Sequence, residues 1–136
     1  MTTYSGHLPE PVTGITGELL CAEPRVTVQH QEPRTDRRRT RLLNPRLDLV
    51  NHSPAGLAWG YFGSGPSQLS LALLADATGH DALALRLHQQ FKEEVVAQWS
   101  WESGWQITRR EILNWTRERT EYIASARARR LQETQP

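Results

Sequence analysis

The sequence predicts an α+β fold, with an antiparallel β-hairpin or small sheet at the N-terminus followed by three α-helices. Apolar residues alternate in the first half of the chain, as in half-buried strands, and recur every three or four residues in the second half, as in helices. A length of 136 residues fits one domain with one core. We therefore expect a single domain over residues 1–136, with a strand and loop region at 1–62, a three-helix region at 63–126 and a frayed tail at 127–136.

The strands of the first half are predicted from short alternating runs. Residues 2–8 predict the first strand, and the proline- and glycine-rich stretch after it predicts a loop or a loose hairpin. Val26 and Val28 fall on one face of a second run, and the pattern resumes at residues 40–43 after a polar stretch. We expect a hairpin with an arginine-rich turn here.

The first predicted helix begins in the segment Gly63 to Pro66. Ser64 or Gly65 can cap it, and Pro66 suits the first helical position, where a missing N–H costs nothing. The helix is apolar on nearly all sides and should end at Gly79, a residue type that favours the left-handed C-terminal cap. It is the helix that we expect to be buried.

Two further helices are predicted. The second runs from about Asp81, as its cap, to Trp99, with apolar residues every four positions. The third begins at a capping box made by Thr108 and Glu111, flanked by two isoleucines placed as a hydrophobic staple. Its expected inward stripe is Ile112, Trp115, Tyr122, Ile123 and Ala126.

Composition excludes some classes of protein. No apolar run approaches the length of about 18 residues that a membrane span needs, and residues 1–10 lack the basic start and apolar stretch of a signal peptide. We expect a cytoplasmic protein that does not contact membranes. The single cysteine, Cys21, has no partner for an internal disulfide, and it is expected to be packed rather than reactive.

Positive charge is concentrated in two segments, although the net charge is only +1. Residues 25–46 carry seven arginines and a net charge of +5, residues 109–130 carry seven more and a net of +4, and the rest of the chain sums to −8. Such segments can dock on phosphates, on an acidic protein or on the acidic remainder of the chain itself. The arginine run from Arg34 to Arg41 is either a hairpin tip that clamps phosphates or a merely solvated turn.

Five tryptophans are present, and Trp99, Trp101 and Trp105 fall within seven positions. They either line a groove for a protein or single-stranded nucleic acid, or seal the end of the helical core. Together with the arginines they give the candidate residues for binding a partner or nucleic acid: Arg34, Arg37, Arg38, Arg39, Arg41, Trp99, Trp101, Arg109, Arg110 and Arg117.

Catalytic and metal-binding patterns are weak, so we expect no enzyme, no metal and no cofactor. His52 beside Ser53, with Asp48 four residues earlier, is a poor hydrolytic set because neighbours in one turn rarely reach each other in the order that a triad demands. No two histidines stand four residues apart as zinc ligands. The segment 63–68 could present backbone N–H groups to an anion, but a tight turn that packs nearby aromatic residues explains it better.

Six segments have distinctive residue combinations: the runs Leu43 to Leu49, Asn51 to Pro54, Trp59 to Tyr61, Gly63 to Leu69, Phe91 to Ala97 and the helix entry from Trp105 to Ile112. Together they resemble the small proteins grouped as domain of unknown function 6166. The resemblance covers residues 43–115, leaves out the arginine-rich hairpin, and marks Asn51, His52, Trp59, Gly63, Gly65 and Gln68 as motif residues. It implies an origin in plasmids, phages and other mobile elements, and supplies no catalytic residues.

Three functions follow from these observations. The leading hypothesis is a non-catalytic interaction protein of a mobile element, which inhibits a host defence such as a CRISPR complex by occupying the surface of a host protein or ribonucleoprotein. The alternative is a DNA- or RNA-binding accessory protein that uses the arginine-rich hairpin and the third helix. An enzyme based on His52 has the least support.

Overall fold

A computed structural model describes residues 1–8, 12–13, 19–20 and 24–133 of the chain. Its elements are β1 (Thr2–His7), β2 (Val12–Thr13), β3 (Leu19–Leu20), β4 (Arg25–Gln31), β5 (Arg38–Leu42), α1 (Ser64–Thr78), α2 (Asp81–Glu94), the 3₁₀ helix η1 (Val96–Gln98), β6 (Trp105–Thr108) and α3 (Arg109–Glu133). The expected α+β class is confirmed. Cys21 and the expected end of the tail at 134–136 lie outside the described residues.

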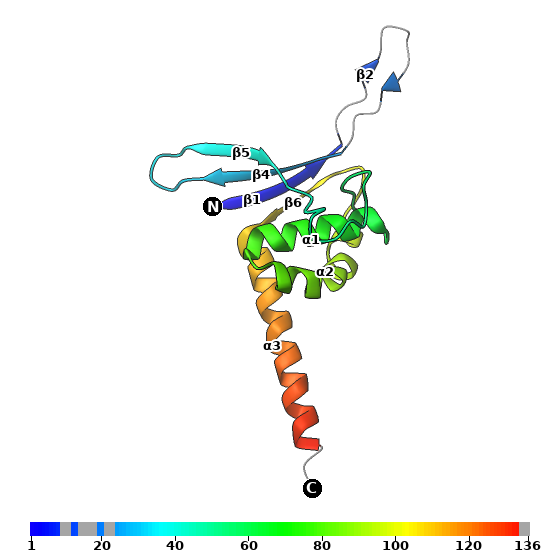
Figure 1. Cartoon of the computed structure of the whole chain (residues 1–136). Coiled ribbons are helices and arrows are strands. Elements are labelled where there is room, and N and C mark those ends of the chain that lie inside the picture. The colour runs from blue at the N-terminus through cyan, green and yellow to red at the C-terminus, as the bar shows by residue number, and fades with distance from the viewer. Residues whose placement is uncertain (9–11, 14–18, 21–23, 134–136) are drawn as a thin grey trace.

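The main sheet has four antiparallel strands in the order β5-β4-β1-β6. Val26, Val28 and Tyr4 point from one face into the core, and Tyr4 and Val28 are fully buried. The predicted hairpin is confirmed as β4 and β5, and the short β2–β3 pair forms a second, separate hairpin. Figure 1 shows all three α-helices on one side of the main sheet, with α1 directly beneath it and α2 beneath α1.

Strand β6 was not predicted, since these residues were expected to be only the approach to the third helix. It pairs with β1, with Tyr4 opposite Ile107 and Gly6 opposite Trp105. The close pairing requires glycine at position 6, because a Cβ atom there would lie 2.3 Å from the Trp105 indole nitrogen. The sheet is therefore not purely N-terminal, and β1 becomes a central strand.

Helix α1 is the buried helix that was predicted, and Gly79 ends it with a left-handed φ of 64°. Its start differs from the prediction, because Gly63 is the N-cap residue and Pro66 stands in the third helical position. Proline is tolerated there because the N–H groups of the first turn have no partner within the helix. The Ser67 hydroxyl and backbone N–H both donate to the Gly63 carbonyl, at 3.0 and 3.1 Å.

Helix α2 ends at Glu94, five residues before the predicted Trp99. Val95 leaves the helical region with φ −123° and ψ −66°, and η1 continues the chain. The cap also differs from the prediction: the His80 ring, not Asp81, accepts a hydrogen bond from the Leu83 N–H at 3.1 Å. Asp81 has a different partner, described below.

Helix α3 begins as the sequence predicted. The Glu111 N–H donates to the Thr108 hydroxyl oxygen at 3.1 Å and the Thr108 N–H donates to the Glu111 carboxylate at 3.2 Å, which completes the capping box. Ile112 is fully buried, but the prediction that Tyr122 faces inward is wrong, since it is 60% exposed. Ile123 still packs against the core, and the last turns of α3 extend away from the sheet and the other helices, as Figure 1 shows.

Candidate functional site

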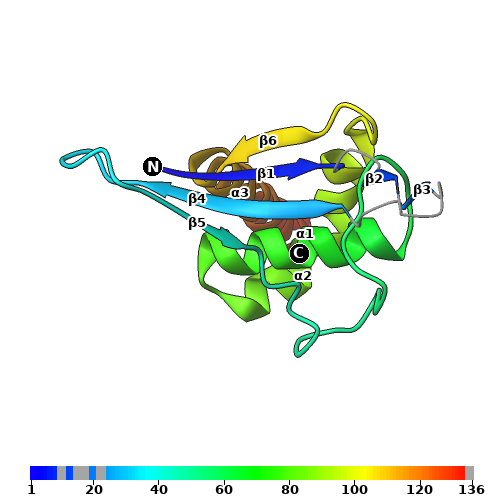
Figure 2. The same ribbon diagram turned by 90° about the horizontal axis from the view of Figure 1, so that it is seen from above.

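The turn between β4 and β5 and the start of β5 carry exposed arginines that have no ionic partner among the described residues. Arg34, Arg37, Arg38 and Arg39 are all exposed, and none of them forms an ion pair within the described part of the chain. Figures 1 and 2 show this turn projecting past the N-terminus and past the helices. The four guanidinium groups are therefore free to meet an anion outside the molecule.

The two carboxylates in this turn serve to shape it. Glu32 accepts a hydrogen bond from the Thr35 hydroxyl at 2.8 Å, and Asp36 accepts one from the Gln31 side chain at 2.6 Å. Asp36 adopts a positive φ of 55°, which a short polar side chain tolerates better than most residues. The turn thus holds its acidic side chains in internal contacts and leaves its arginines exposed.

The register of the sheet brings the second basic segment to the same end. Across the start of β1, Thr2 pairs with His30 of β4 and Thr3 pairs with Thr108 of β6, immediately before α3. An open groove of about 830 Å³ lies here, lined by Met1, Thr2, Thr108, Arg109, Arg110, Leu113, Asn114 and Arg117. We call this region the arginine end: Arg34, Arg37, Arg38 and Arg39 of the hairpin with Arg109, Arg110 and Arg117 of α3.

Arg41 and Arg109 have structural partners. Arg41 donates to both carboxylate oxygens of Asp76 in α1, at 2.8 and 3.0 Å, and Arg109 donates through Nε to the Ala77 carbonyl at 2.8 Å. The Tyr4 hydroxyl donates to the same Asp76 at 2.7 Å. Burial raises the pKa of Tyr4 and the hydrogen bond to Asp76 raises it further. Arg41 thus joins the sheet to α1.

Gln68 fixes the loop that precedes α1. Its fully buried side chain donates to the Pro45 carbonyl at 2.6 Å and accepts from the backbone N–H groups of His52, at 2.8 Å, and Ser53, at 3.3 Å. Both the NH₂ group and the oxygen of the amide therefore help to hold residues 44–63, the docked loop, against the helices. The family resemblance marks Gln68 as a motif residue, and in the structure its side chain stabilises the conformation of this loop.

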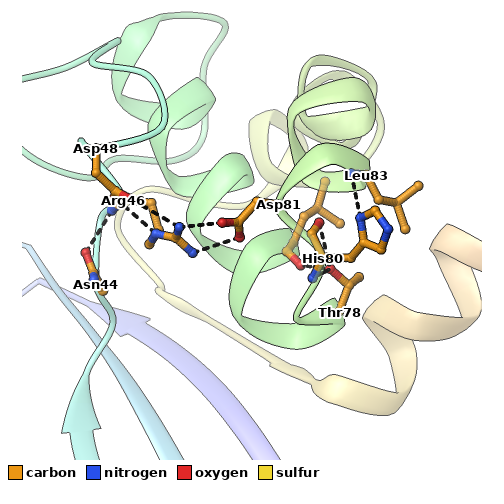
Figure 3. A network of polar contacts seen from close by, with 8 residues as sticks. Asn44, Arg46, Asp48, Thr78, His80, Asp81 and Leu83 are labelled. Carbon is orange, nitrogen blue, oxygen red and sulfur yellow. Dashed lines mark hydrogen bonds and ion pairs between the residues drawn. The ribbon is translucent and has the colours of Figure 1, made fainter.

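Arg46 anchors the same loop from outside (Figure 3). It makes paired contacts with Asp48, at 3.1 and 3.2 Å, and with Asp81 at the start of α2, at 2.8 and 3.0 Å. Hydrogen bonds from Arg46 lower the pKa of both carboxylates and, in turn, raise the pKa of the guanidinium. Asn44 accepts from the Arg46 N–H at 2.9 Å, which supports the positive φ of 58° at Arg46.

The tryptophans pack against each other rather than line a groove. Trp99 and Trp105 stack with ring centroids 4.2 Å apart, and Trp59 lies 4.8 Å from Trp101 and 5.9 Å from Trp105. Trp59 is fully buried and donates to the Ser100 carbonyl at 3.1 Å. This arrangement matches the expected alternative in which the tryptophans seal one end of the core.

Three exposed aromatic rings border this cluster. Phe62 is 65% exposed, Tyr61 49% and Trp101 38%. Gly63 and Gly60 allow close approaches here: a Cβ at Gly63 would lie 2.5 Å from the Tyr61 ring, and one at Gly60 would lie 2.8 Å from the Trp99 carbonyl oxygen and 3.1 Å from the Trp101 backbone nitrogen. A tight turn that packs the nearby aromatic residues was expected at residues 63–68: Trp59 is fully buried, the Tyr61 ring lies against Gly63 and Gly65 at the start of α1, and Phe62 is mostly exposed. We call Tyr61, Phe62 and Trp101 the aromatic surface.

A pair of histidines was missed by the sequence analysis. The Nε2 atoms of His52 and His88 lie 2.9 Å apart, and Nδ1 of the buried His88 lies 2.8 Å from the Leu85 carbonyl, to which it donates. Burial lowers the pKa of His88, and the neighbouring His52 lowers it further. A hydrolytic set of His52, Ser53 and Asp48 is not assembled, because Asp48 pairs with Arg46 and the His52 ring faces His88.

Two further motif residues, Asn51 and Gly65, have different surroundings. The Asn51 side chain is exposed, and Gly65 lies where a Cβ would come within 2.6 Å of the Ala58 methyl carbon.

Across the described ranges, no three histidine, cysteine, aspartate or glutamate side chains gather as ligands for a metal ion. The helices of the described part are too short or too polar to cross a membrane.

The fold defines a small α+β domain in which one sheet covers a helical core. The family model described as Family of unknown function (DUF6166) matches residues 24–118, and the chain belongs to this family. The match is wider than the resemblance over 43–115, because it also includes the arginine-rich hairpin. Searches of curated proteins and of solved structures give no match.

Proposed function

We propose that this protein is a non-catalytic nucleic-acid-binding accessory protein of a phage- or plasmid-type mobile element, and that the arginine end contacts phosphates. The supporting observation is that two basic segments, about 70 residues apart in the chain, meet at one end of the sheet with their arginines exposed. From β5 to β6 the sheet spans three strand spacings, or about 14 Å. Arginines over such a distance can engage several phosphates at once.

The test is the salt dependence of binding. A labelled nucleic acid is titrated with the protein at several salt concentrations, and the slope of log K against log salt counts the phosphate contacts. Replacing Arg37, Arg38 and Arg39 by alanine should weaken binding and make the slope shallower by about three.

A matched control removes the same charge elsewhere. The variant with Arg86, Arg127 and Arg129 replaced by alanine loses three exposed arginines from α2 and the distal half of α3. Its slope should stay close to that of the unmodified protein. Equal losses in the two variants, or binding that is absent or insensitive to salt, would contradict the proposal.

The aromatic surface supports a second candidate function, binding of a host protein, for instance in the inhibition of a defence complex such as CRISPR. Exposed aromatic side chains are frequent at the centres of protein interfaces, and the Phe62 side chain is 65% exposed. The test is a nuclease-treated pull-down with the unmodified protein and with the Tyr61→Ser, Phe62→Ser variant. A host protein retained only by the unmodified protein supports this function, and a nuclease-sensitive eluate contradicts it.

A further inference from the structure

We infer that the nucleic acid bound at the arginine end is B-form duplex DNA, with the β4–β5 turn entering its major groove. This inference rests on the proposed function and goes beyond it, because the charges alone would suit any nucleic acid. It depends on three features of the arginine end: which side chains are absent, how the hairpin projects, and how the arginines are distributed over its two faces.

The arginine end lacks a stacking platform for single strands. Proteins that bind single-stranded nucleic acid combine a basic groove with aromatic rings on which successive bases stack. Among the described residues, the exposed tyrosine, phenylalanine and tryptophan side chains are Tyr61, Phe62, Trp101 and Tyr122. The first three form the aromatic surface, and Tyr122 lies near Arg119 in a depression that Glu94 of α2 also lines. The exposed apolar side chains in the groove itself are only Met1 and Leu113.

The shape of the β4–β5 hairpin suits insertion into a DNA groove. The major groove of B-DNA admits a two-stranded β-ribbon, whereas the major groove of A-form RNA is too deep and narrow for one. The turn closes through the Glu32 N–H and the Arg37 carbonyl, 3.0 Å apart, and projects beyond the rest of the molecule (Figure 2). A ribbon that is free on both faces can insert without a clash from the helices.

The arginines of the hairpin face both walls of such a groove. Successive strand residues point to opposite faces, so that Arg39, which pairs with His30, lies on the helix side, and Arg38, which pairs with Gln31, lies on the outer side. Beside the ribbon, Arg110 and Arg117 are seven residues apart on one face of α3, or about 10 Å along its axis. They are placed to hold the adjacent phosphate backbone while the ribbon occupies the groove.

The experiment compares three probes of one sequence at one salt concentration: a 20-base-pair DNA duplex, one of its single strands, and the corresponding RNA duplex. The DNA duplex should bind at least about 10-fold more tightly than the other two. Equal binding of the single strand or of the RNA would overturn the inference and leave the proposed function standing. No binding of any probe would overturn both.

The position of the turn is tested by methylation of guanine N7, an atom exposed in the major groove. Bound protein should protect N7 from dimethyl sulfate, and the Arg34→Ala, Arg37→Ala variant at saturating concentration should lose the protection. The Arg110→Ala, Arg117→Ala variant removes equal charge, and it should bind more weakly yet still protect at saturation. Protection that survives in the first variant, or that never occurs, would overturn the placement of the turn in the groove.

Discussion

The docked loop and the arginine end use the same residue type in opposite ways. In the docked loop, Arg46 makes four hydrogen bonds to two carboxylates and is only 23% exposed in its side chain. At the arginine end, Arg38 and Arg39 are exposed and have no ionic partner among the described residues. Bidentate pairing fixes a backbone, whereas unpaired guanidinium groups remain available to an external anion. Whether an arginine stabilises the fold or is available for binding thus depends on its partners and not on its presence alone.

The largest expected effect is on the stability of the docked loop. Gln68→Ala leaves the Pro45 carbonyl and the N–H groups of His52 and Ser53 without their partner and opens a cavity in the core. The free energy of unfolding, measured by urea denaturation, should fall by about 3 kcal/mol. The folded variant should bind DNA as the unmodified protein does.

Two variants separate the possible causes of this loss. Gln68→Met keeps much of the side-chain volume but removes the hydrogen bonds. Its unfolding free energy should therefore fall by most of the amount expected for Gln68→Ala. Gln106→Ala removes an exposed glutamine from β6 and should change the unfolding free energy by less than about 0.5 kcal/mol. If Gln68→Met were as stable as the unmodified protein, the amide would not be the anchor of the loop.

A smaller effect is expected when the two kinds of arginine are exchanged for lysine. Arg46→Lys keeps the charge but loses the paired contacts with Asp48 and Asp81, so the unfolding free energy should fall by about 1 kcal/mol. Arg38→Lys should leave stability unchanged within about 0.5 kcal/mol. Thermal unfolding of the two variants side by side measures the difference, and equal stabilities would remove the distinction between the two regions.

The smallest effect concerns pH. Burial lowers the pKa of His88 in the folded protein, while the unfolded chain takes up a proton below about pH 6.5. The stability from neutral His88 is therefore complete above that pH and falls as the pH drops. The slope should stay below the roughly 1.4 kcal/mol per pH unit that one full proton gives.

Urea denaturation between pH 7.5 and pH 5.5 measures this slope. His88→Gln should flatten it, and His7→Gln, which changes an exposed histidine at the end of β1, should leave it as it is. Stability that rises toward acid pH in the unmodified protein would contradict the assignment of a neutral, buried His88.

Local signals made part of the fold predictable. The capping box of Thr108 and Glu111, the C-terminal glycine of α1 and the alternation of Val26 and Val28 each operate within a few residues, so the sequence alone reveals them. Strand β6 is only four residues long and is a strand because β1 offers it an edge. That pairing joins residues about 100 positions apart, which no local pattern contains.

The candidate site likewise has a part that local sequence patterns reveal and a part that depends on long-range contacts. The two arginine-rich segments are visible in the sequence, but their meeting depends on the central position of β1 between β4 and β6. The partners of Gln68 lie 15 to 23 residues away, and His52 lies 36 residues from His88. For this reason the sequence alone does not reveal that Gln68, one of the motif residues, anchors the docked loop.

The most direct measurement of the central claim is a titration of ¹⁵N-labelled protein with a 20-base-pair DNA duplex, followed through the backbone amide resonances. The account predicts shifts at residues 31–39 and 108–117, with little change in the docked loop at residues 44–63. Shifts concentrated in the docked loop and at Trp101, with the arginine end unchanged, would contradict it.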